Sequence, residues 1–114
     1  MSFRHDFHEW ALAPHGAWLD HSWDLEGDVF KTAEGKIFLI CAGDGRSASA
    51  TLKLPPSDAL AALTLSFVRA AAWPRRWITA TVTNEAERDI TLAWVLQSYE
   101  LVSSKHSAPR HLRG

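Results

Sequence analysis

The sequence contains little of what builds disulfide-bonded, membrane-spanning or secreted proteins. Cys41 is the single cysteine among 114 residues, which excludes an intramolecular disulfide and fits a reducing compartment. It lies in the apolar run IFLICAG, so we expect a buried and unreactive thiol. No apolar run approaches the length of a membrane span, and the N-terminal MSFRHDFHEW lacks the apolar region of a signal peptide. We therefore expect a cytoplasmic protein without a membrane partner.

A strong net charge is also absent, because the formal net charge at pH 7 is −1. Residues 103–114 carry Lys105, Arg110 and Arg113 and no acidic residue. This leaves nine of the 12 cationic residues and all 13 acidic residues in residues 1–102, a charge of −4. A strongly basic domain would point directly to nucleic acid. Here an anionic partner must be bound by a local patch instead.

Alternating apolar and polar residues predict a sheet. Two β-rich runs, DVFKTA and KIFLICA, flank Glu34-Gly35, which is a typical hairpin turn. Other segments alternate with the period of two that is expected of half-buried strands. Strands are predicted within 17–23, 28–33, 36–42, 47–54 and 76–83. The segment 66–76 is ambiguous and is either extended or a loop.

Helical spacing of apolar residues predicts helices at 3–11, 57–65 and 84–102. Asn84 is the expected N-cap of the last helix, because Glu87 stands three residues later, as a capping box requires. Ser57 is the expected N-cap of the second helix. The apolar stripe of the last helix is predicted to include Ile90, Ala93, Trp94 and Leu101.

These elements predict an α+β fold. We expect a single two-layer domain over residues 1–102, with a mainly antiparallel sheet and helices on one of its faces. Residues 103–114 form a basic tail that we expect to be disordered.

The register of the hairpin assigns side chains to the two faces of the sheet. If Glu34-Gly35 is a two-residue loop, Lys31 pairs with Phe38, and directly opposed residues share a face. The more apolar set is expected beneath the helices: Phe30, Thr32, Ile37, Leu39 and Cys41. The uncovered face then carries Val29, Lys31, Lys36, Phe38, Ile40, Lys53, Trp77, Thr79 and Thr81. A slip of one residue would scatter this set.

Two interpretations of the uncovered face stay open. Antiparallel sheets commonly leave one face to solvent, and lysines there oppose edge-to-edge aggregation. Binding of an anion is favoured by WPRRW, residues 73–77, which places guanidinium groups between two indoles. This is the chemistry that binds phosphates and unstacked bases. The candidate nucleic-acid-binding residues are Lys31, Lys36, Lys53, Arg69, Trp73, Arg75, Arg76 and Trp77.

No pattern in the chain assembles catalytic machinery. No serine stands in a nucleophile elbow, and no nucleophile, base and oxyanion donor come together, so we expect neither an enzyme nor a cofactor. His5 and His8 have a spacing that can bind zinc on a helix. However, Phe7 and Trp10 claim the buried face of that helix and no cysteine ligand accompanies the histidines, so we expect no metal site.

The order of the motifs resembles the MmcQ/YjbR family of small bacterial proteins. The motifs are HEWALAPHGA, HSW, GDVFKTAEGKIFLI, TLKL and EAERDITLAWVLQSYELV, which span residues 8–102. The resemblance implies a compact α+β domain with a curved antiparallel sheet of the double-wing type, and DNA binding through that sheet. The positions that match the family pattern are Trp23, Phe30, Lys31, Lys36, Phe38, Lys53 and Trp77.

We therefore expect a non-catalytic DNA-binding protein that contacts the phosphate backbone through the basic and aromatic face of its sheet. Binding should be largely non-specific in sequence, since no recognition helix is evident. The alternative is a protein- or peptide-interaction module, or a homodimer, that uses the same open face. A small-ligand pocket lined by Trp18, Trp23 and Lys31 is a third class.

Overall fold

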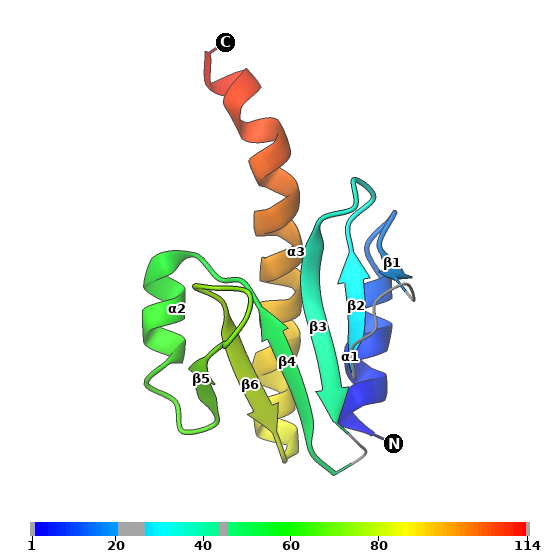
Figure 1. Cartoon of the computed structure of the whole chain (residues 1–114), viewed down its shortest axis with the longest axis vertical. Coiled ribbons are helices and arrows are strands. Elements are labelled where there is room, and N and C mark those ends of the chain that lie inside the picture. The colour runs from blue at the N-terminus through cyan, green and yellow to red at the C-terminus, as the bar shows by residue number, and fades with distance from the viewer. Residues whose placement is uncertain (1, 21–26, 44–45, 114) are drawn as a thin grey trace.

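The computed structural model describes residues 2–20, 27–43 and 46–113, with side chains described as far as Ser103. Across these residues, six strands form one antiparallel sheet in the order β1-β2-β3-β4-β6-β5 (Figure 1). The elements are α1 (Phe3–Leu12), β1 (Trp18–Asp20), β2 (Asp28–Lys31), β3 (Ile37–Gly43), β4 (Ala48–Leu52), α2 (Pro56–Ala62), β5 (Val68–Ala70), β6 (Ile78–Val82) and α3 (Glu85–Arg113). The predicted α+β fold, an antiparallel sheet with helices on one face, is confirmed. Trp23, which the family resemblance singled out, lies outside the described residues.

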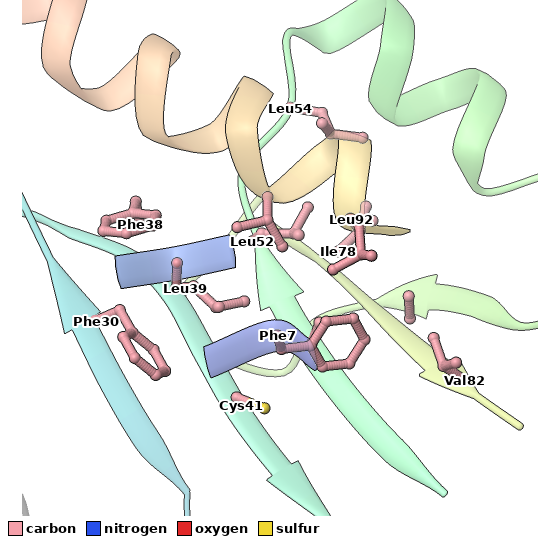
Figure 2. Close-up of a cluster of buried hydrophobic side chains, with 14 of the residues drawn as sticks. Phe7, Phe30, Phe38, Leu39, Cys41, Leu52, Leu54, Ile78, Val82 and Leu92 are labelled. Carbon is pink, nitrogen blue, oxygen red and sulfur yellow. The ribbon is translucent and has the colours of Figure 1, made fainter. Parts of the chain in front are cut away.

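The core lies between the sheet and the helices behind it. Register aligns Leu39, Leu52 and Ile78 in one row across β3, β4 and β6, and all three side chains are buried. The next row on the same face is small: Cys41, Ala50 and Ala80. Figure 2 shows Phe7 of α1 packed over this side of the sheet, close to Cys41. Small side chains in the sheet leave room for a phenylalanine from the helix, as close packing of a protein interior requires.

The hairpin between β2 and β3 departs from the predicted register. The turn spans Thr32 to Lys36, where the Thr32 amide donates to the Lys36 carbonyl at 2.8 Å and Gly35 has a φ of +87°. Pairing holds from Asp28 to Phe30, but Lys31 then lies opposite Ile37. Phe38 is therefore the extra residue of a β-bulge. The prediction that Phe38 shares the uncovered face with Lys31 is wrong, because Phe38 is fully buried and meets Tyr99 of α3 edge-on at 5.1 Å.

Ser98 of α3 connects the helix to this bulge. The pair that would follow Leu39 and Leu52 along the β3–β4 ladder is Phe38 and Lys53. The Ser98 hydroxyl stands between them: it donates to the Phe38 carbonyl at 2.7 Å and accepts from the Lys53 amide at 3.0 Å. Ser98 is fully buried. A side chain of α3 thus satisfies two main-chain groups that the sheet would otherwise leave unpaired.

Helix α3 begins as predicted. The Asn84 side chain accepts from the Glu87 amide at 2.9 Å, and the Glu87 carboxylate accepts from the Thr83 amide at 2.9 Å. The helix extends to Arg113, past Val102, where we expected it to end. No glycine follows Val102 before Gly114, so the usual residue for helix termination is missing there. The division into a 1–102 domain and a separate tail stays a prediction.

The buried stripe of α3 differs from the predicted one. Ile90 is 41% exposed, although it was expected in the core. The stripe instead includes two polar residues, each of which donates to a carbonyl: Thr91 to Glu87 and Ser98 to Phe38. An apolar pattern alone misses such positions, because a buried hydroxyl is tolerated once it is hydrogen-bonded. The buried residues of the stripe are Thr91, Leu92, Val95, Ser98 and Val102.

Two expectations near the β5 edge are also resolved. Helix α2 begins at Pro56 with Pro55 in the N-cap position and no side-chain cap, so the prediction of Ser57 as the cap is wrong. Proline suits the first turn of a helix because it has no N–H to satisfy there. The ambiguous segment 66–76 contains the strand β5, which pairs with β6.

None of the described helices is both long and apolar enough to cross a bilayer.

Two serine-to-alanine substitutions in α3 should have opposite effects on stability. Ser98→Ala leaves the Phe38 carbonyl and the Lys53 amide unpaired, which should lower the free energy of unfolding by about 2–4 kcal/mol. The Ser103 hydroxyl is buried and has no hydrogen-bond partner within the described part of the chain. Ser103→Ala should therefore be neutral or raise stability by up to about 1 kcal/mol. Urea unfolding of both variants tests this, and equal effects would contradict the bridging role of Ser98.

Candidate nucleic-acid interface

Lys31 is neutralised within the sheet. Its ammonium lies 2.6 Å from the Asp20 carboxylate and 5.6 Å from the centre of the Trp18 ring. The two charged side chains are only 17% and 8% exposed. The pairing of β1 with β2 sets Trp18 opposite Lys31 and Asp20 opposite Val29, so all lie on the face away from the helices. Lys31 is on the predicted face, but its charge is already matched by a carboxylate, with which a phosphate would have to compete.

The hydroxyl row on the same face is satisfied internally. The Thr51 and Thr79 hydroxyls are 2.8 Å apart, and Thr79 is 5% exposed. Arg69 of β5 donates to the Thr81 hydroxyl at 3.2 Å, which keeps its exposed side chain against β6. The placement of Thr79 and Thr81 beside Arg69 agrees with the predicted face. Each of these hydroxyls thus already contacts a neighbouring side chain on this face.

The remaining predicted cations lie at one end of the sheet. Lys36 is in the β2–β3 turn, Lys53 follows β4, and Arg75 and Arg76 are in the connection between β5 and β6. Figure 1 shows these connections at the end toward which α3 extends. Lys53 and Arg76 line the same hollow. The structure therefore brings this set together at the end of the sheet and leaves Lys31 on its face.

The connection at residues 71–77, here called the WPRR loop, is closed by its own backbone. The Ala71 amide donates to the Trp77 carbonyl at 2.9 Å, and the Trp77 amide donates to the Pro74 carbonyl at 3.3 Å. Trp73 remains 53% exposed, whereas Trp77 is half-buried. Arg76 has a φ of +70°, which is uncommon for a residue other than glycine. The loop thus displays one indole beside two exposed guanidinium groups.

One stretch of the chain contains arginines but no acidic residue. Residues 59–84, which include β5, the WPRR loop and β6, contain three arginines and no acidic residue. Ion pairs with other parts of the chain occupy Arg4, Lys31 and Arg88. In the described part of the chain, Lys36, Arg69, Arg75 and Arg76 take part in no ion pair. The lack of acidic residues in this stretch can be read from the sequence. The pairing of Lys31 with Asp20 cannot, because it depends on the register between β1 and β2.

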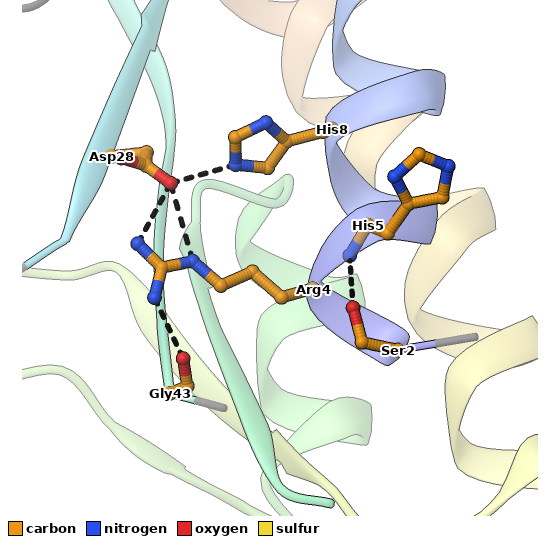
Figure 3. A network of polar contacts seen from close by, with 6 residues as sticks. All are labelled: Ser2, Arg4, His5, His8, Asp28 and Gly43. Atoms are coloured by element: carbon orange, nitrogen blue, oxygen red, sulfur yellow. Dashed lines mark hydrogen bonds and ion pairs between the residues drawn. The ribbon is translucent and has the colours of Figure 1, made fainter. Parts of the chain in front are cut away.

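Helix α1 is attached to the sheet by a carboxylate that accepts from two of its side chains (Figure 3). Asp28 of β2 lies 2.8 Å from Arg4 and 2.6 Å from His8, and Arg4 also donates to the Gly43 carbonyl at 2.7 Å. Burial raises the pKa of Asp28, but the hydrogen bonds and charges of Arg4 and His8 outweigh it and hold the pKa below its ordinary value.

This cluster shows no chemistry beyond attachment. The expectation that Cys41 is buried is confirmed. Burial raises the pKa of its thiol to about 12, which disfavours the reactive thiolate. His8 is engaged with Asp28, and His5 lies 3.4 Å from Glu9 on the same helix. Among the residues that the structure describes, no three histidine, cysteine or acidic side chains gather in a way that could hold a metal ion.

Comparison with known proteins identifies solved structures with a similar fold. No family model and no curated protein matches this chain. Similar solved structures include a Pseudomonas syringae structural-genomics protein, with a TM-score of 0.66 and 19% identity over 86% of this chain and 97% of that one. Another is the Deinococcus radiodurans protein DR2400, a DUF419 domain, with a TM-score of 0.77 and 17% identity over 90% of this chain and 79% of that one. The chain has the fold of these proteins. At such identities the likeness concerns the fold alone.

Removing Lys31 should destabilise the protein, since Asp20 would keep a buried charge with one partner fewer. We expect Lys31→Met to lower the free energy of unfolding by about 3 kcal/mol, the low end of the range for breaking a buried ion pair. Lys36→Met, at an exposed lysine of the adjacent turn, should change it by less than about 0.5 kcal/mol. Equal costs in urea unfolding would show that the ion pair contributes nothing.

The Asp28 cluster should make stability depend on acid. A carboxylate whose folded pKa is depressed stabilises the fold above its ordinary pKa, 3.8, and loses this stabilisation as pH falls through the lower folded value. The difference in unfolding free energy between wild type and Asp28→Asn should therefore shrink as pH drops from about 6 to about 2. Arg4→Met should weaken the same dependence. A difference that stays constant across this range would contradict the assignment.

Proposed function

We propose that this protein is a non-catalytic DNA-binding module of the MmcQ/YjbR type. Its interface is the end of the sheet around the WPRR loop. The exposed indole of Trp73, next to two guanidinium groups in a stretch without acidic residues, carries the proposal. Phosphates would be held by Lys36, Lys53, Arg69, Arg75 and Arg76.

Local charge supports this choice over the face of the sheet as a whole. Lys31 already has Asp20, so a phosphate there would compete with a carboxylate at 2.6 Å. At the WPRR loop no such competitor stands among residues 59–84. The acidic residues elsewhere then help to orient the protein, because a negative duplex is repelled from those surfaces and attracted to this end.

The mode of binding follows from the side chains available. Arginine and lysine position a protein on the backbone without reading bases, and the WPRR loop is a connection between strands rather than a helix that could enter a groove. Binding should therefore be largely sequence-independent and strongly weakened by salt. Trp73 adds a surface on which an unpaired or partly unstacked base can stack. The order of the motifs resembles that of the MmcQ/YjbR family, whose members are described as DNA-binding, and this resemblance supports the same function.

A second candidate is a protein-interaction module. It is favoured by Trp18, which is 41% exposed on the edge strand β1. Its indole N–H donates to the Thr32 carbonyl, so the ring is held in place rather than free to fold away. Aromatic residues that are exposed and fixed are common at protein interfaces. Such binding would be insensitive to salt, because apolar contacts release no counterions.

A salt titration of binding to a short DNA duplex tests the proposal. Wild-type affinity should fall steeply between about 50 and 200 mM salt. Arg75→Gln and Lys36→Gln should each reduce the slope of log affinity against log salt by about 1. Trp73→Ala should leave the slope unchanged but weaken binding to a single-stranded oligonucleotide about 5- to 150-fold, the effect of losing one stacked base.

Matched variants outside the interface serve as controls. Trp10→Ala removes another exposed tryptophan, on α1, and Arg46→Gln removes an exposed arginine that precedes β4 at the opposite end of the sheet. Neither should change affinity or slope. Absence of duplex binding at low salt, or equal losses in the control and interface variants, would rule the proposal out. Salt-insensitive capture of a protein that depends on Trp18 would favour the second candidate.

A further inference from the structure

A hollow of about 570 Å³ lies where α2 faces α3 beyond the end of β4. Its apolar lining comes from three segments: Leu54 precedes α2, Pro56, Ala59 and Leu60 belong to α2, and Leu101 belongs to α3. Figure 2 shows Leu54 between α3 and the segment that continues into α2. The volume falls in the range of small-molecule sites, which are mostly apolar with a few placed polar groups.

Helix α2 approaches α3 on another of its sides. There the Gln97 amide reaches Asp58 at 3.5 Å, and Ala62, Leu65 and Trp94 line a second hollow. The opposite side of α2 turns Leu60 outward, where it is 70% exposed. A leucine so exposed beside other apolar side chains is an unfavourable arrangement in water, and it becomes favourable when an apolar ligand covers it.

The polar groups of the hollow are cations. Lys53 and Arg76 line it, and none of the other described side chains that line it is acidic. Lys53 is held in place through its backbone, because its amide donates to Ser98. Arg76 is the residue with the left-handed backbone conformation, so the WPRR loop turns sharply at the point where it borders the hollow. Two positive charges beside an apolar surface are complementary to an amphipathic anion.

We propose that this hollow binds a small aliphatic carboxylate. The hydrocarbon tail would lie against Leu54, Leu60 and Leu101, and the carboxylate would meet Lys53 and Arg76. An aliphatic tail fits better than a nucleotide base, since bases are held by stacking and edge hydrogen bonds. The described lining contains no aromatic ring, amide or hydroxyl side chain. The apolar part of the site is distinct from the proposed DNA interface, whereas Lys53 and Arg76 belong to both.

Titration of the full chain with octanoate, followed by calorimetry and by amide chemical shifts, tests this inference. We expect saturable binding of one octanoate, with shifts at α2, Leu54 and Leu101. Leu60→Asp should weaken binding at least tenfold, and the exposure of Leu60 means that the fold should tolerate the change. Arg76→Asn should also weaken it at least tenfold, because asparagine accepts the left-handed conformation but carries no charge.

Matched controls separate the site from general adsorption. Leu63→Asp changes a partly exposed leucine at the C-cap of α2, outside the hollow, and Lys36→Gln removes a charge outside it. Both variants should bind octanoate as the wild type does. Octanol, which lacks the charge, and butyrate, which lacks the tail, should each bind at least tenfold more weakly than octanoate. Non-saturable binding, or equal affinity in Leu60→Asp and Leu63→Asp, would overturn the inference. Trp73→Ala should keep octanoate affinity, so loss of DNA binding and loss of this site are separable.

Discussion

The two hydrogen bonds of the Ser98 hydroxyl are the constraint on which most of this structure depends. They insert a side chain of α3 into the ladder between β3 and β4, at Phe38 and Lys53. The bulge at Phe38 would otherwise leave these main-chain groups without partners, at a cost that a small domain can hardly bear. Because the bulge turns Phe38 toward the helices, Ile37 takes the place opposite Lys31. The bulge at Phe38 thus determines both a core contact and which residues lie on the uncovered face.

The cationic side chains fall into two groups, those held in ion pairs and those that are exposed. Within the sheet, a carboxylate from the adjacent strand lies within reach of Lys31, and the resulting ion pair stabilises the fold. Arg4 and Arg88 are used in the same way, to hold α1 against β2 and α3 against α1. Where the chain leaves the sheet, in the WPRR loop, no acidic residue is near in sequence, and the guanidinium groups face outward. Separation of neutralised from exposed charge gives a chain with little net charge a local group of exposed cations at this end of the sheet.

This end of the sheet combines two different surfaces. The WPRR loop displays an indole and two guanidinium groups, while the adjacent hollow is apolar and is bordered by Lys53 and Arg76. Both arise from connections rather than from the sheet itself: the β5–β6 loop, and the proline-started helix α2. The rigid sheet positions these segments, and the segments carry the chemistry. The same division of labour is common in proteins whose binding residues lie on loops.

Local sequence patterns are sufficient to identify four features. These are the helix N-cap at Asn84, the alternation of residues 47–54, the hairpin at Glu34-Gly35 and the basic, aromatic character of residues 73–77. Each of these depends on neighbours a few residues away, so it can be read from the chain alone. Tertiary structure decided the rest. One extra residue in β3 moved Phe38 beneath the helices, a strand distant in sequence brought Asp20 to Lys31, and buried hydroxyls at Thr91 and Ser98 displaced the apolar stripe from Ile90. These outcomes depend on register and on pairs far apart in the chain, where a shift of one residue exchanges the faces of a strand.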